Sequence, residues 1–81
     1  MKTTESVLWL FDKVNDVRVA AARDAEKLDA LSKDPALERE ALEKFPDEPM
    51  LYQQLQALLE TDRILARQGV FLTPRSFWEE S

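Results

Sequence analysis

Residues 4–31 read TESVLWLFDKVNDVRVAAARDAEKLDAL, a stretch that contains neither Gly nor Pro. Its apolar side chains recur at three- and four-residue spacing, which is the period of an amphipathic α-helix. The apolar positions on this face are Val7, Leu10, Phe11, Val14, Val17, Ala21, Ala25, Leu28 and Leu31. Because no helix breaker interrupts it, the stretch predicts one long first helix over about residues 4–31.

Helix-breaking residues divide the remainder of the chain. Asp34 is a favourable N-cap and Pro35 a favourable first helical residue, so a short second helix is expected over about residues 35–45. A third helix is expected over about residues 48–68, where Gly69 provides the C-terminal stop. These elements predict an all-α fold.

The last predicted segment is an apolar tail over residues 70–81. Residues 1–81 are expected to form one domain, either an elongated helical hairpin or a three-helix bundle. A first helix of about 28 residues is about 42 Å long, whereas a compact globule of this size is about 30 Å across. Because the helix would overhang such a globule, we expect self-association or a partner helix along it.

The composition excludes several classes of function. The chain has no His, no Cys and a single Gly, which removes zinc fingers, thiol nucleophiles, imidazole acid–base catalysis and glycine-rich phosphate loops. A net charge of −5 disfavours direct binding of nucleic acid. No apolar run approaches the roughly 18 residues of a membrane span. We therefore expect a cytoplasmic protein that is not an enzyme, has no cofactor or metal and binds no membrane.

Some apolar side chains lie off the main helix faces. Leu8 and Trp9 lie away from the stripe of the first helix, and Ile64 lies nearly opposite the main face of the third. Either the tail or the second helix covers Trp9, or these side chains contact a partner. The tail aromatics are likewise either core or a recognition element. The predicted partner-binding residues are Leu8, Trp9, Ile64, Phe71, Phe77 and Trp78.

Most of the negative charge lies in residues 35–49, which hold two basic and five acidic residues. The acidic side chains are Glu38, Glu40, Glu43, Asp47 and Glu48. A solvated helix and turn explain such a cluster, and so does an acidic docking surface.

Asp62 interrupts the main apolar face of the third helix, and Arg18 interrupts that of the first. A buried carboxylate is costly unless it is paired, so we predict an Arg18–Asp62 contact between antiparallel first and third helices. A parallel arrangement is expected to abolish the pair. The alternative is that Asp62 faces water at a seam of the bundle.

Three non-catalytic functions fit these patterns. The first is a protein–protein interaction module, such as an adaptor, chaperone or assembly factor, forming a homodimer or a hetero-complex. The second is a small acidic inhibitor of the phage or antitoxin type, and the third is a structural subunit of a larger complex. Residues 45–66, with Tyr52-Gln53-Gln54 leading into an apolar helix, loosely resemble the helical-hairpin co-chaperones of type III secretion needle subunits. The resemblance implies a chaperone or adaptor.

Overall fold

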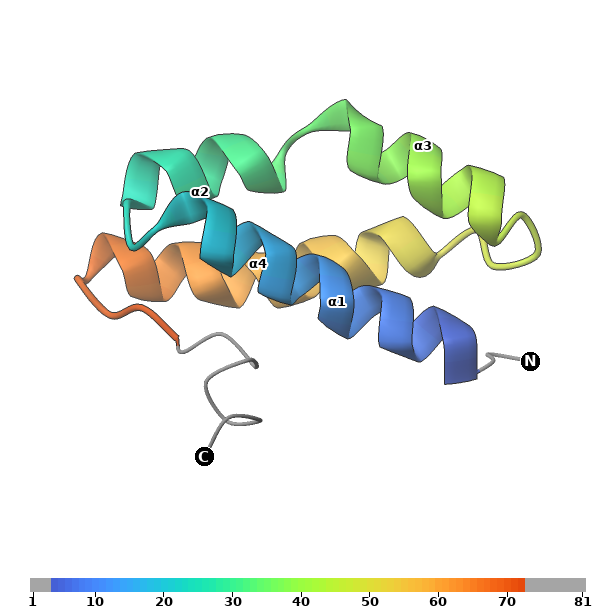
Figure 1. Cartoon of the computed structure of the whole chain (residues 1–81), viewed down its shortest axis with the longest axis horizontal. Helices are drawn as coiled ribbons and strands as arrows, with labels where there is room; N and C mark the ends of the chain where they lie inside the picture. The colour runs from blue at the N-terminus through green and yellow to red at the C-terminus, as the bar shows by residue number, and fades with distance from the viewer. Residues whose placement is uncertain (1–3, 73–81) are drawn as a thin grey trace.

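A computed structural model describes residues 4–72 of the chain, which form helices and no strand. The helices are α1 (Thr4–Ala21), α2 (Ala25–Ser32), α3 (Pro35–Lys44) and α4 (Leu51–Arg67). Figure 1 shows α1 and α4 side by side and running in the same direction, while α2 and α3 return in the opposite direction. The predicted all-α fold class is confirmed.

The first helix ends ten residues earlier than residues 4–31 predict, at Ala21. Ala22 and Arg23 follow with φ angles of 52° and 62°, in the left-handed region that non-glycine residues rarely adopt. This short turn reverses the chain. The prediction of one unbroken helix is therefore wrong, and the molecule has α1 and α2 in its place.

The N-cap of α2 provides the local stabilisation for this reversal. The Asp24 carboxylate accepts hydrogen bonds from the backbone N–H groups of Glu26, at 2.9 Å, and Lys27, at 3.2 Å. Such a cap is typically worth about 1 kcal/mol, which offsets part of the cost of the two left-handed residues. Burial of Ala21 and Leu28 across the turn adds apolar stabilisation that a straight helix would not gain.

The reversal shortens the molecule. Its radius of gyration is 12.8 Å and its principal extents are 36 × 29 × 16 Å. The overhanging 42 Å helix expected from the sequence is absent, so helix length gives no reason to expect a partner.

The remaining boundaries follow local signals. Asp34 caps α3 by accepting the N–H of Ala36 at 2.9 Å, as predicted. At the other end of the chain, Gly69 has a φ of 81°, and the Val70 N–H donates to the Leu65 carbonyl at 2.9 Å. This geometry is a Schellman C-cap, so the predicted glycine stop is confirmed. The third predicted helix starts later than expected, at the beginning of α4.

Apolar side chains from all four helices form the core between them. Its buried members are Trp9, Leu10, Val14, Val17, Ala21, Leu28, Ala41, Leu51, Leu55, Leu59 and Ala66. Two side chains that the periodicity places on core faces remain half-exposed: Phe11 at 51% and Leu58 at 38%. The partial exposure of both is a feature that periodicity does not predict.

The predicted pair between Arg18 and Asp62 is present. Arg18 Nε donates to Asp62 Oδ2 at 2.6 Å and its Nη2 donates to Oδ1 at 3.1 Å, while Asp62 is only 4% exposed. The pair forms although the two helices are parallel, as the hydrogen bond from Ser6 of α1 to Glu48, just before α4, also shows. The expectation that a parallel arrangement would abolish the pair is therefore wrong. Contacts at separations of 42 and 44 residues require α1 and α4 to be parallel.

A buried cation, Arg63, joins α2 to α4. Arg63 is almost fully buried and donates to Ser32 Oγ at 2.9 Å and to Glu60. The Arg63 guanidinium lowers the pKa of the Glu60 carboxyl. Gln56 completes the contact by donating to the Ser32 carbonyl at 2.7 Å. Arg63 was not predicted as a core residue from its neighbours in sequence.

Candidate functional site

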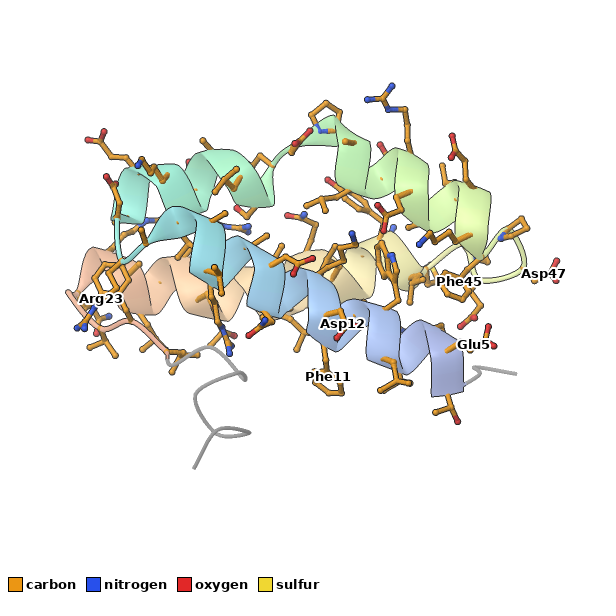
Figure 2. The ribbon with its side chains drawn as sticks, in the orientation of Figure 1. Glu5, Phe11, Asp12, Arg23, Phe45 and Asp47 are labelled. Carbon is orange, nitrogen blue, oxygen red and sulfur yellow. The ribbon has the colours of Figure 1, made fainter. Side chains whose placement is uncertain are left out.

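An open cleft of about 470 Å³ separates the first half of α1 from the end of α3. Its lining combines apolar and charged side chains: Glu5, Leu8, Trp9, Asp12, Lys44 and Phe45. Figure 2 shows Glu5, Phe45 and Asp47 at the end of the bundle where α1 begins and α3 ends. We refer to this feature as the α1–α3 cleft.

Trp9 forms the floor of the cleft and connects α1 to α3. The side chain is only 6% exposed, and its indole N–H donates to the Glu40 carboxylate of α3. Its ring meets Phe45 edge to face, with centroids 6.1 Å apart and an interplanar angle of 65°. Both contacts exist only when α3 packs against α1, so the floor is formed by tertiary structure.

Glu40 is the charged centre of this contact. Lys13 Nζ lies 2.8 Å from its carboxylate, and Lys44 Nζ lies 3.9 Å away. The hydrogen bond from Lys13 is the main cause that lowers the pKa of Glu40; the Trp9 N–H also lowers it, and partial burial opposes the shift. Glu40 therefore remains a carboxylate under ordinary conditions and holds α1 against α3.

The rim of the cleft is acidic and its wall is apolar. Glu5 is an exposed carboxylate in the first turn of α1, Asp12 is exposed about two turns later, and Leu8 lies between them with 50% of its surface exposed. Lys44 is the cationic group of the lining. Apolar surface beside carboxylates suits a ligand that carries a cation next to apolar groups.

The structure separates the residues predicted to bind a partner. Leu8 and Trp9 meet in the cleft, although Trp9 is buried by α3, as one of the two sequence interpretations proposed. Ile64 is exposed on α4 and does not line the cleft. Phe71 packs partly buried against the core, with its ring centroid 5.9 Å from Arg23 Cζ. Phe77 and Trp78 lie outside the described residues.

The five residues of the predicted acidic surface fall into two groups in the structure. Glu40 and Glu48 bond to side chains of α1, so both carboxylates have a structural role. Glu38, Glu43 and Asp47 are exposed. Of the five predicted acidic residues, only these three keep an exposed carboxylate that is not used in a contact with α1.

Sequence reasoning missed Glu5, Asp12, Lys44 and Phe45 as members of the site. A signal was present for the part on α1, because Glu5, Leu8 and Asp12 are spaced three and four residues apart and share one helix flank. The part on α3 had no such signal. Phe45 reaches Trp9 through a contact between residues 36 positions apart in the sequence.

No protein-family profile, curated protein or solved structure matches this chain significantly. Within residues 4–72, no helix is long and apolar enough to cross a membrane. The same residues hold no cluster of three or more side chains suited to a metal ion.

Proposed function

We propose that this chain is a non-catalytic protein–protein interaction module, an adaptor, chaperone or assembly factor, and that the α1–α3 cleft is its contact surface. The proposal rests mainly on Leu8, which is half-exposed in the cleft beside the floor that Trp9 and Phe45 form. An open apolar cleft with a fixed floor costs little reorganisation when a partner side chain enters it.

The charges of the cleft support one kind of partner. Glu5 and Asp12 are exposed on either side of the apolar wall that Leu8 forms. We infer a partner segment that presents Lys or Arg beside apolar side chains, such as one face of an amphipathic helix. The apolar side chains would pack on Leu8 and the cation would meet the rim carboxylates.

A peptide-display selection on the pure protein tests this proposal. We expect it to enrich segments that combine a basic residue with apolar residues at helical spacing. A synthetic enriched peptide should shift the NMR signal of the Trp9 indole N–H, which lies at the floor. Leu8→Glu should weaken binding of that peptide by about tenfold or more, since it buries a charge against an apolar surface.

Leu42→Glu is the matched control, because Leu42 is 49% exposed on α3 and lies outside the cleft. It should leave peptide binding unchanged. Equal loss of binding in both variants, or enriched peptides without basic residues, would contradict the proposed contact surface.

A small acidic inhibitor is the second candidate function, supported by the exposed carboxylates of Glu38, Glu43 and Asp47. Reversing these three charges to Lys would remove binding to a basic target surface while leaving the folded state intact. The same triple variant should still bind a peptide in the α1–α3 cleft. This difference separates the two functions.

A further inference from the structure

The turn between α1 and α2 holds two residues in a conformation that their side chains disfavour. Ala22 and Arg23 have φ angles of 52° and 62°, in the left-handed region where a Cβ atom crowds the backbone. Glycine is the residue that adopts such angles without strain, and neither position has one. Figure 2 shows Arg23 at the end of the bundle opposite Phe45, and both turn residues are exposed.

The same residues favour a straight helix. Alanine is the strongest helix former and arginine is close to it. The apolar spacing continues through the turn at helical intervals, from Ala21 to Ala25 and Leu28. A helix over residues 4–32 would therefore remove both left-handed angles and extend the backbone hydrogen bonding of α1 into α2. Within one molecule this helix is excluded, because it would carry α1 away from α3 and α4.

The contacts that hold α1 in place can be made equally well by a second copy of the chain. Arg18 binds Asp62 and Ser6 binds Glu48, both across more than 40 residues of sequence. These contacts depend on how the helices pack and not on the turn. We propose that two chains exchange α1: residues 4–32 straighten into one helix in each copy, and each α1 packs on α2, α3 and α4 of the other copy.

The two straightened helices cross where their turns were. Each is about 43 Å long, and its middle carries Ala20, Ala21 and Ala22. These small side chains allow the two helices to approach closely at the crossing. Arg23 and Asp24 bring one positive and one negative charge from each copy, so the crossing has no excess charge.

The exchange rebuilds the α1–α3 cleft from two chains. Leu8 and Trp9 come from one copy, while Lys44 and Phe45 come from the other, so the dimer presents two such clefts. Because the exchange joins two chains, it grows with protein concentration, and the dilute protein stays in the monomeric form described above. The inference concerns the packing of α1 and does not depend on what the cleft binds.

Complementary charge reversals test the exchange directly. Arg18→Asp opposes two carboxylates between α1 and α4, and Asp62→Arg opposes two guanidinium groups, so each variant alone should lose stability. In an exchanged heterodimer, α1 of each variant meets α4 of the other. One contact then has the native pair and the other has the reversed pair. After refolding together from urea at high concentration, the two variants should form a dimer that melts at least about 10 °C above either variant alone.

The control mixture combines Arg18→Asp with Arg18→Met, which both change α1 and leave Asp62 unpaired in every arrangement. It should show no gain in melting temperature. Light scattering gives the mass of the species in both mixtures. If the Arg18→Asp and Asp62→Arg mixture stays monomeric, or melts as the sum of its two components, the proposed exchange is wrong.

Two glycine variants test whether the turn controls the exchange. Ala22→Gly relieves the left-handed angle in the monomer and weakens the straight helix in the dimer. The dimerisation constant should therefore fall at least about tenfold for each of the two turns. Ala20→Gly is the matched control, because residue 20 is helical in both forms, and it should leave the constant unchanged. Sedimentation equilibrium of the refolded proteins measures both constants. Equal effects of the two variants, or an unchanged protein that stays monomeric at high concentration, would overturn the exchange.

Discussion

Removing the carboxylate of Asp62 should destabilise the protein more than any surface change. Its two oxygens accept both hydrogen bonds from Arg18, and the side chain is 4% exposed. Asp62→Ala leaves the Arg18 guanidinium between α1 and α4 without its partner. The loss of stability then comes mainly from leaving a partly buried cation without a partner.

The magnitude follows from the burial of the two partners. Breaking a buried pair by removing one member costs about 3–5 kcal/mol. Because 20% of the Arg18 side chain is exposed, water can rehydrate part of the guanidinium, so we expect about 2–3 kcal/mol. A domain of this size has a total stability on the order of 4–12 kcal/mol. The midpoint of thermal unfolding should therefore fall by about 10–20 °C.

Urea unfolding followed by far-UV circular dichroism measures this loss of stability. A double-mutant cycle shows how much of the loss belongs to the interaction between Arg18 and Asp62. Arg18→Met combined with Asp62→Leu removes both charges, and should cost clearly less than the sum of the single changes. We expect a coupling energy of about 2 kcal/mol. Losses that add independently would refute the reasoning, as would no recovery of helicity when Arg18→Asp is combined with Asp62→Arg.

Two further predictions concern the contact between α1 and α3 and the turn after α1. Glu40→Gln should cost about 1 kcal/mol near neutral pH, because it removes the charge that binds Lys13. The pKa of Glu40 is lowered below its ordinary value of 4.5, so this stabilisation is present above that value. It is lost as the pH falls through the lowered pKa. Urea unfolding at neutral and strongly acidic pH should show the two proteins converging in acid, and a constant difference would contradict this assignment. Ala22→Gly should leave the stability unchanged or raise it, since glycine adopts the positive φ of 52° without strain. Ala20→Gly, inside α1, should lower the stability by about 1 kcal/mol. Equal losses in thermal unfolding of the two glycine variants would contradict the position of the turn.

Capping residues in the sequence predicted the helix ends that short-range backbone hydrogen bonds determine. Asp34 with Pro35 located the start of α3, and Gly69 located the end of α4, because each supplies or permits a specific backbone hydrogen bond. The Arg18–Asp62 pair was predictable because a charge on an apolar face is costly without a partner. The direction of the helices was not predictable in this way, because two residues can come level in either orientation.

Gly and Pro do not mark the reversal after α1, since residues 1–34 contain neither. Ala22 and Arg23 adopt left-handed angles although neither residue favours them. Asp24 did carry a signal, an N-cap followed by Glu26 in the first turn of α2. The energy that decides between a straight helix and a turn comes from packing α2 on α1 and α4, which periodicity within one segment does not report.

The candidate site was predictable only in part. The periodicity marked Leu8 and Trp9 as off-face residues, and both line the α1–α3 cleft. It could not show that Trp9 is buried, since Phe45 and Glu40 reach it from a helix more than 30 residues away. Long-range packing of this kind turns an apparent surface aromatic into the floor of a cleft.

The α1–α3 cleft of the dilute monomer depends on the chain reversal between α1 and α2, because α3 reaches α1 of the same chain only if the chain turns back. Spin labels on Thr4→Cys and Lys33→Cys measure it directly by double electron–electron resonance. The two helices pack about 10 Å apart and antiparallel, so we predict a label separation of about 15–25 Å. An unbroken helix over the same residues would place the labels about 44 Å apart, and a distance near that value would contradict the fold described for this protein.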